Sequence, residues 1–232
     1  MPVVGRAHGN NTSILEEPER PEPCCFDEWA VHSASRARRR GVGAPITGRM
    51  LEALDRQGLD SRTMLDVGCG TGDLALASIA RGADHATGID LAGGAIAQAR
   101  SLAAERGLTD RTSFTAADGA VAPLAPHDVV ALNRVLCCYP SVDSLLTNTL
   151  GAARAVYAYT APVHIGLIGR FNRISVAISN RWFGLREKKF RGFRAFVHDL
   201  DAVDRTIAAA GFRRVHDSRV RGVWQLAVFT RA

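Results

Sequence analysis

The chain has 232 residues, of which 47% are hydrophobic and 22% charged, with a net charge of +6. This composition is typical of a globular protein, and the length suits one α/β domain with an extension. No stretch approaches the roughly 18–20 uninterrupted apolar residues of a membrane span. The segment Met1 to Glu22 lacks the apolar core of a secretory signal. We therefore expect a cytoplasmic protein without a membrane span.

The basic residues gather at Arg36–Arg40 and Arg181–Arg194. Such a bias can attract nucleic acid, anionic lipid or an acidic small molecule. Neither segment has the interleaved aromatic and basic residues of an RNA-binding signature, so a nucleic-acid partner is disfavoured.

The five cysteines include two vicinal pairs, Cys24–Cys25 and Cys137–Cys138, together with Cys69. An odd number without a secretory signal predicts reduced thiols. Vicinal spacing does not match the usual zinc motif, and we predict no metal site. The pairs are either buried thiols or contacts for a substrate or a soft metal. On an extended segment, Cys137 and Cys138 would point to opposite sides, which argues against a soft acceptor such as arsenic.

The residue pattern along the chain predicts a flexible tail at residues 1–23, which is rich in polar residues and proline, and an amphipathic N-terminal helical cap at 24–58. Within that cap, residues 26–57 read as helical, with an interruption near Gly41–Pro45. The main domain then covers 59–232, with a cap insertion at about 162–199.

Short β-rich runs alternate with amphipathic helices in the main domain, which predicts parallel strands with right-handed crossovers. The expected strands are 63–67, 85–90, 112–116, 128–133 and 156–160, and the helices are 73–80, 94–106 and 142–155. Helices at 171–183 and 201–210 follow. Two further strand-like runs, 212–220 and 223–230, form a hairpin, so the last strand should run antiparallel to the others.

The glycine-rich segment at residues 65–73 is the strongest functional signal. Gly68, Gly70 and Gly72 alternate directly after a predicted buried strand, which lets the backbone turn sharply and approach a ligand closely. The following helix directs its N-terminal amides to the same place. About 20 residues on, Asp90 ends the next strand, where a carboxylate can accept hydrogen bonds from a ribose diol.

The details of this segment argue against a dinucleotide. The dinucleotide fingerprint is G-x-G-x-x-G, whereas here the third glycine comes one residue early and Asp73 stands in its place. Asp66 and Asp73 would repel a pyrophosphate but attract a ligand that carries an ammonium and a sulfonium. These charges favour S-adenosylmethionine as the cofactor.

In these residues the chain resembles the class I S-adenosylmethionine-dependent methyltransferases. The matching segments are Asp66–Gly72, Gly88–Leu91, Ala117–Gly119 and Leu132–Val135. The resemblance implies a doubly wound, mostly parallel, seven-stranded Rossmann-like sheet with an antiparallel last strand and helical cap elements. Segments 133–140 and 223–229 resemble, more loosely, small bacterial methyltransferases grouped with magnesium-protoporphyrin O-methyltransferases.

The resemblance also implies the cofactor contacts. Asp90 would hold the ribose hydroxyls, Leu91 would lie against the adenine, and Asp118 would bond the adenine amino group. The loop glycines and Asn133 would lie near the methionine end. The full predicted cofactor set is Asp66, Gly68, Cys69, Gly70, Gly72, Asp90, Leu91, Asp118, Gly119, Asn133 and Arg134.

The acceptor should bind beyond the carboxyl ends of the strands, beneath the N-terminal helix and the cap insertion. Six phenylalanine or tryptophan residues and six arginines lie in that insertion or beside it, namely Phe171, Trp182, Phe183, Phe190, Phe193 and Phe196 with Arg170, Arg173, Arg181, Arg186, Arg191 and Arg194. They would suit a flat or anionic substrate. Alternatively, the aromatics dock the helix on the sheet and the arginines are solvated.

A hydroxyl acceptor gains from a general base, for which His198 is the first candidate, with Tyr139 and His164 behind it. We predict an O- or N-methyltransferase that acts on a small aromatic or acidic metabolite in biosynthesis. The alternatives are an RNA methyltransferase that uses the arginine clusters, and a protein that binds the cofactor without methylating.

Overall fold

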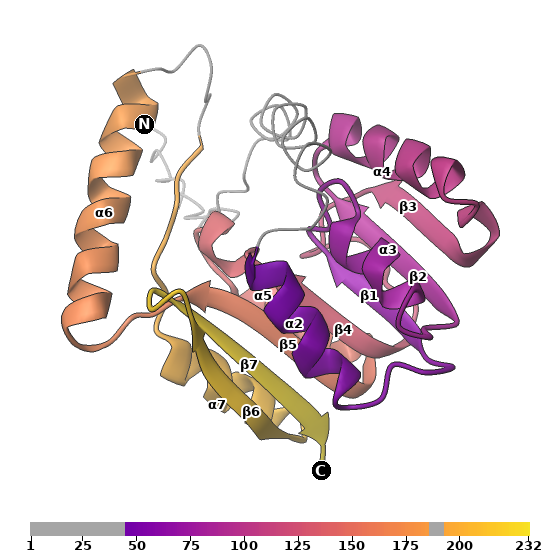
Figure 1. Cartoon of the computed structure of the whole chain (residues 1–232). Coiled ribbons are helices and arrows are strands. Elements are labelled where there is room, and N and C mark those ends of the chain that lie inside the picture. Colours follow the sequence, from indigo (N-terminus) through magenta and orange to yellow (C-terminus); the bar gives the residue numbers. More distant parts are fainter. Residues whose placement is uncertain (1–44, 186–192) are drawn as a thin grey trace, which may run out of the picture.

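The alternation of strands and helices builds one twisted seven-stranded sheet in the order β3-β2-β1-β4-β5-β7-β6 (Figure 1). The computed structural model describes residues 45–185 and 193–232. The strands are β1 (Thr63–Val67), β2 (His85–Asp90), β3 (Thr112–Ala116), β4 (His127–Asn133), β5 (Ala153–Pro162), β6 (Phe212–Val220) and β7 (Trp224–Arg231).

Strand directions confirm the predicted fold class. β1 pairs in parallel with β2 and β4, β2 with β3, and β4 with β5, whereas β7 runs antiparallel to both β5 and β6. The chain moves outward from β1 to β3, then returns to β4 on the other side of β1. This reversal leaves a crevice at the carboxyl ends of β1 and β4, where ligands bind in open α/β sheets.

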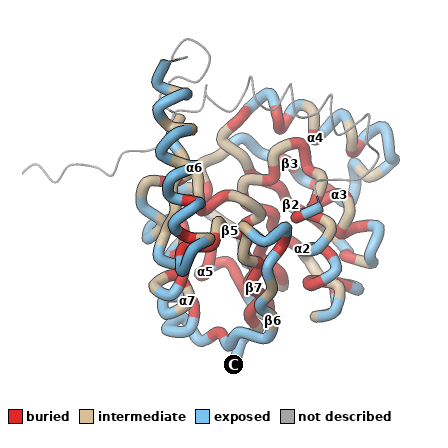
Figure 2. Tube along the Cα trace, turned by 60° about the vertical axis from the view of Figure 1, so that its left-hand side comes forward, coloured by how far each residue is buried: buried red, intermediate tan, exposed pale blue. Residues whose placement is uncertain are grey.

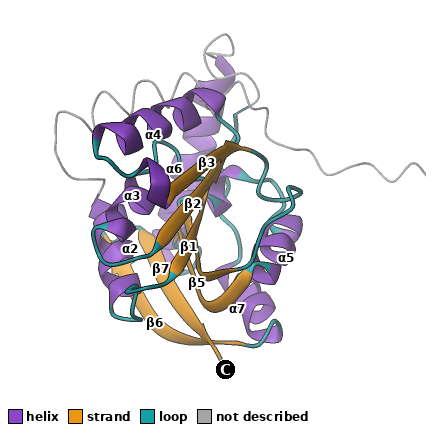
Figure 3. Cartoon of the chain, turned by 90° about the vertical axis from the view of Figure 1, so that its right-hand side faces the viewer, coloured by secondary structure: helices purple, strands orange, loops and turns teal. Residues whose placement is uncertain are grey.

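Helices cover both faces of the sheet, as doubly wound folds require (Figure 3). The first face carries α2 (Pro45–Asp55), α3 (Asp73–Ile79) and α4 (Gly93–Glu105), and the second carries α5 (Asp143–Gly151) and α7 (Leu200–Ala209). In β1, Met64 packs with the α2 side, while Leu65 and Val67 pack with the α5 and α7 side. This alternation follows from the two-residue period of a strand.

The last long helix, α6 (Gly166–Leu185), lies at the edge of the molecule, at the left of Figure 1. It is longer than the predicted helix at 171–183. In the described part of the chain, no helix is long and apolar enough to cross a membrane.

The predicted boundary between one helix and the strand that follows it was wrong. The helix expected over 142–155 ends at Gly151, because Ala153 already belongs to β5 and pairs with His127. The Arg231 guanidinium also donates to the carbonyls of Ala153 and Arg154 (2.6 and 2.8 Å), which fixes them as strand residues. Of the expected helix at 26–57, the part at Pro45–Asp55 is observed as α2, and Arg56 and Gln57 form a turn. Residues 26–44 lie outside the described residues, with the tail and the rest of the expected N-terminal cap.

Candidate functional site

The loop between β1 and α3 turns through three glycines in the left-handed region, Gly68, Gly70 and Gly72, with φ of 67°, 54° and 79°. L side chains rarely adopt this conformation. At Gly68 a Cβ atom would also collide with Val135 Cγ2. The amides of Gly68 and Cys69 both donate to the Ile89 carbonyl (2.7 and 3.0 Å). The loop is therefore fastened to the end of β2.

Asp90 receives this loop at the end of β2. Its Oδ2 accepts the Gly70 amide at 2.7 Å, and its Oδ1 accepts the Ala92 amide at 2.9 Å. Both carboxylate oxygens are thereby oriented at the crevice, in the position that the sequence predicts for ribose recognition.

Asp66 is the most perturbed carboxyl group of the site. It is 1% exposed, and neither of its oxygens has a hydrogen-bond partner at ordinary distance and angle among the described residues, although the Ala75 amide lies close enough to interact. Burial raises its pKa to about 8, and the negative charges of Asp90 and Asp73 add to the rise, while the Ala75 amide and Arg134 offset part of it. A buried carboxyl group without a partner is costly, which makes Asp66 a candidate for binding a ligand.

Asn133 and Arg134 follow β4 on the other side of the crevice. The Asn133 amide donates to Thr47 Oγ1 (2.8 Å) and accepts from Thr160 Oγ1 (2.9 Å). The Thr160 hydroxyl also accepts the Arg134 amide at 2.9 Å. Arg134 has φ of 64°, and its buried Nε has no partner among the described residues. The strained backbone of Arg134 thus places a guanidinium group at the pocket, and the Nε of this group lacks a partner among the described residues.

These elements enclose a pocket of about 460 Å³. Nine of the eleven predicted cofactor residues line it, namely Asp66, Gly68, Cys69, Gly70, Asp90, Leu91, Gly119, Asn133 and Arg134. Gly72 and Asp118 do not. The sequence reasoning did not single out Thr47 and Trp224, which also line the pocket. Both come from elements far apart in the chain. Thr47 belongs to no motif, and Trp224 lies in the segment 223–229, whose loose resemblance assigns it no role.

Asp118 does not line the pocket, but its carboxylate accepts a hydrogen bond from Tyr139. The Tyr139 hydroxyl donates to Asp118 Oδ1 at 2.8 Å, and the Ala120 amide donates to the same oxygen at 2.9 Å. Tyr139 lines the pocket. Burial and the hydrogen bond to Asp118 raise its pKa well above the ordinary value, so its hydroxyl keeps its proton at neutral pH.

The two candidate histidines do not line the pocket. His198 Nε2 lies 2.9 Å from both the Leu136 and the Tyr139 carbonyl oxygens, to which it can donate. Burial lowers the pKa of His198, although these carbonyl contacts partly oppose the shift. His198 thus supports the segment that carries Tyr139 without reaching the pocket itself.

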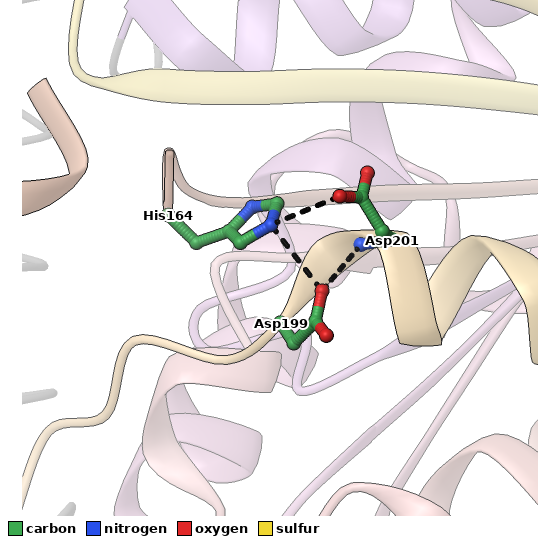
Figure 4. Close-up of side chains that lie close together, drawn as sticks. All are labelled: His164, Asp199 and Asp201. Carbon is green, nitrogen blue, oxygen red and sulfur yellow. Dashed lines mark hydrogen bonds and ion pairs between the residues drawn. The ribbon is translucent and has the colours of Figure 1, made fainter. Parts of the chain in front are cut away.

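His164 lies beside the start of α7 (Figure 4). Its Nε2 is 3.3 Å from Asp199 Oδ1 and 3.5 Å from Asp201 Oδ2. Asp199 caps α7, because its Oδ1 also accepts the amides of Asp201 and Ala202. His164 therefore belongs to a helix cap in this geometry.

The segment of Cys137 and Cys138 is not extended, so the condition for their side chains to point to opposite sides is not met. They belong to a short 3-10 helix, Leu136–Cys138, in which both thiols line the pocket with their sulfur atoms 3.9 Å apart. The opposite-side argument holds only for an extended segment. The hydrogen bond from Cys138 and the charge of Arg134 lower the pKa of Cys137, whereas its partner's pKa is raised.

Some aromatic residues of the cap insertion line the pocket, and others are exposed on the surface. Phe183 and Phe193 line the pocket and pack edge to face, with their ring centres 5.1 Å apart. Phe171 and Trp182 are exposed. None of the insertion's described arginines lines the pocket. Phe190, Arg186 and Arg191 lie outside the described residues. Among the described residues, the insertion therefore contributes aromatic side chains to the pocket lining, and none of the expected arginines.

Comparison with known proteins agrees with this geometry. Residues 64–155 match the model of a methyltransferase domain family. A ribosomal protein L11 methyltransferase from Actinobacillus succinogenes is 33% identical over 150 residues, which cover 61% of this chain and 50% of that protein. The chain thus spans half the length of this curated relative. It spans 31% of the length of two further ribosomal protein L11 methyltransferases, from Pasteurella multocida and Haemophilus influenzae.

Solved structures show the same fold at low sequence identity. Magnesium protoporphyrin IX methyltransferase from Synechocystis, crystallised with S-adenosylmethionine, has a TM-score of 0.64 and 15% identity, over 92% of this chain and 99% of that chain. The cyclase SpnF has a TM-score of 0.61 and 18% identity, over 79% and 80%.

The sheet order and the glycine loop are those of a Rossmann-like fold, and residues 64–155, which include the glycine loop, match a methyltransferase domain family. The chain is thus similar to S-adenosylmethionine-dependent methyltransferases in fold and in this domain.

Proposed function

We propose that the pocket binds S-adenosylmethionine and that the chain transfers its methyl group to a small-molecule acceptor. The observation that carries the proposal is the pair of unsatisfied groups at the pocket, the Asp66 carboxyl group and the Arg134 guanidinium. The methionine end of the cofactor has an ammonium and a carboxylate, which are the two partners that these groups lack.

Each end of the cofactor finds matching residues in this pocket. Asp66 would hold the ammonium and Arg134 the carboxylate, while Asp90 would accept the ribose hydroxyls. Gly70 has no atom within 4 Å of the place where a Cβ would stand, so the loop leaves room for a ligand against its backbone. When bound, the cofactor supplies a methyl group on a sulfonium sulfur.

The chain's own residues would mainly align the reactants, because methyl transfer is a direct displacement. Tyr139 is the predicted catalytic residue that reaches the pocket, and its neutral hydroxyl group would orient the acceptor. The rings of Phe183 and Phe193, which line the pocket, would exclude water from the acceptor. The aromatic residues of the lining, Tyr139, Phe183, Phe193 and Trp224, suit an aromatic acceptor of metabolite size.

A turnover screen tests the function. The protein is incubated with S-adenosylmethionine and a panel of aromatic hydroxyl, amine and carboxylate compounds, and S-adenosylhomocysteine is quantified by mass spectrometry. We expect acceptor-dependent turnover and a product 14 Da heavier. Cofactor binding without turnover across the panel would contradict methyl transfer and favour a binding role.

A protein acceptor is the second candidate, because the curated relatives are named ribosomal protein L11 methyltransferases. The screen therefore includes ribosomal protein L11. Methylation of that protein, with no turnover on small molecules, would replace the small-molecule assignment.

A further inference from the structure

The helix α6 is built with its apolar side facing away from the protein. Most of its length is exposed in Figure 2. Six large apolar residues recur along it at intervals of three or four and are between 42% and 86% exposed, namely Leu167, Phe171, Ile174, Ile178, Trp182 and Leu185. This spacing places them on one face of the helix.

The opposite face of α6 attaches to the protein through polar anchors. The Asn172 side chain donates to the carbonyls of Val163 (2.8 Å) and Val223 (3.0 Å). The Asn180 side chain donates to the Ala195 carbonyl (2.9 Å) and accepts the Ala195 amide (2.8 Å). Directional hydrogen bonds thus hold the helix, and its apolar stripe remains available. An exposed stripe of this kind marks an interaction surface.

The charges on α6 identify the kind of partner. The helix carries three arginines, Arg170, Arg173 and Arg181, and no acidic residue. Two copies of such a helix would bring like charges together along their apolar stripes, which disfavours pairing with a second copy. An anionic lipid surface satisfies both features, because it accepts an apolar face together with arginine side chains.

The aromatic residues fit the same partner. Phe171 and Trp182 lie in the exposed stripe, and amphipathic aromatic rings favour the boundary between lipid headgroups and acyl chains. We propose that α6 is an interfacial helix that docks the protein onto the surface of an anionic membrane, lying in the plane of the headgroups. Phe183, which contacts Trp182 edge to face, lines the pocket, so the helix that docks also contributes to the pocket wall.

Vesicle flotation tests the docking, with the full chain and no cofactor or acceptor, so its outcome is independent of the proposed methyl transfer. We expect binding to vesicles that contain phosphatidylglycerol and at least tenfold weaker binding to phosphatidylcholine alone. Salt at about 0.5 M should weaken the binding, because it screens the arginines.

Two variants and one control give the test its specificity. Ile174→Glu with Ile178→Glu should reduce vesicle binding at least tenfold, and Arg170→Gln with Arg181→Gln should remove the preference for phosphatidylglycerol. The control Val121→Glu changes a residue that is 54% exposed elsewhere on the surface and should bind like the wild type. Unchanged thermal unfolding would show that the variants are folded.

Three results would overturn the proposal. The first is wild-type protein that fails to float with either vesicle. The second is a Glu variant that binds as well as the wild type. The third is a concentration-dependent dimer in sedimentation velocity that the Ile174→Glu and Ile178→Glu changes abolish, which would assign the stripe to a second copy.

Discussion

Gly70 donates its backbone amide to the Asp90 carboxylate across 2.7 Å, which joins the loop after β1 to the end of β2. Just before this loop, Asp66 in β1 has a buried carboxyl group with no hydrogen-bond partner of ordinary geometry among the described residues. The ends of β1 and β2 thus hold one acidic residue with hydrogen-bond partners and one without, and this difference has consequences that can be measured.

The stability of the unliganded protein should fall as the pH rises towards 8. The folded protein keeps a proton on Asp66 up to about pH 8, whereas the unfolded chain loses it near the ordinary carboxyl value of 3.8. The folded state binds the extra proton in this window, so rising pH costs stability. Asp66→Asn replaces the titrating carboxyl group with an amide that stays neutral. We therefore expect the melting temperature of this variant to decline less between pH 5 and 8 than that of the wild type. An equal decline in both proteins would contradict this assignment.

Cofactor binding should release a proton from Asp66. An ammonium placed against the carboxyl group favours its charged form. Calorimetric titrations at pH 7 in buffers of different ionisation enthalpy should detect the release, and the affinity of the wild type should rise from pH 6 to 8. In Asp66→Asn, the proton release should vanish and the affinity should drop at least tenfold, or about 1.4 kcal/mol.

Gly68→Ala should impair both the loop and the cofactor site. Its φ of 67° and the collision with Val135 would cost about 1–3 kcal/mol, measured by denaturant unfolding. The matched control is Gly107→Ala, which has φ of 65° but no atom within 4 Å of the added methyl group. Gly107→Ala should retain wild-type cofactor affinity. Equal losses of affinity in the two variants would indicate a general effect on the backbone.

Tyr139→Phe should lower turnover less than a hundredfold and leave the pH profile of kcat unchanged. The raised pKa of Tyr139 keeps its hydroxyl protonated, so it can orient an acceptor but cannot serve as a base at neutral pH. Tyr157→Phe, which alters a buried tyrosine outside the pocket, serves as the control. Loss of an ionisation from the Tyr139→Phe profile would show that Tyr139 is the base.

Cys137 and Cys138 should react together with one phenylarsine oxide. Their sulfur atoms are 3.9 Å apart, which a single bridging atom can span after a small movement. Both thiol protons leave with the oxide oxygen as water, while two As–S bonds form. The experiment needs a Cys24→Ser and Cys25→Ser background, because the chain has a second vicinal pair. We expect S-adenosylmethionine to protect the pair, and unprotected reaction would place the thiols outside the cofactor site.

The sequence predicted the fold well, because its signals are local and periodic. Buried runs such as Thr63–Val67, followed by glycine, determine the strands and the switch point. The Asp66, Gly70 and Asp90 positions follow from the same segment. The helix end at Gly151 was missed because alanine is compatible with both helix and strand, and the pairing of Ala153 with His127 decides between them.

The acceptor side of the pocket could not be predicted in the same way. Thr47 and Trp224 reach it from elements far apart in the chain. Cys138 lines the pocket because residues 136–138 form a short 3-10 helix, and no sequence motif predicts this helix. His198 occurs in a suggestive sequence position, but its ring is directed to backbone carbonyls.

Calorimetric titration of S-adenosylmethionine into the wild type and into Asp90→Ala tests the central claim most directly. An exposed carboxylate outside the pocket, Asp110, provides the control variant Asp110→Ala. The account predicts saturable binding to the wild type and the control, with affinity at least tenfold lower in Asp90→Ala. Unchanged affinity in Asp90→Ala, or no binding to the wild type, would contradict it.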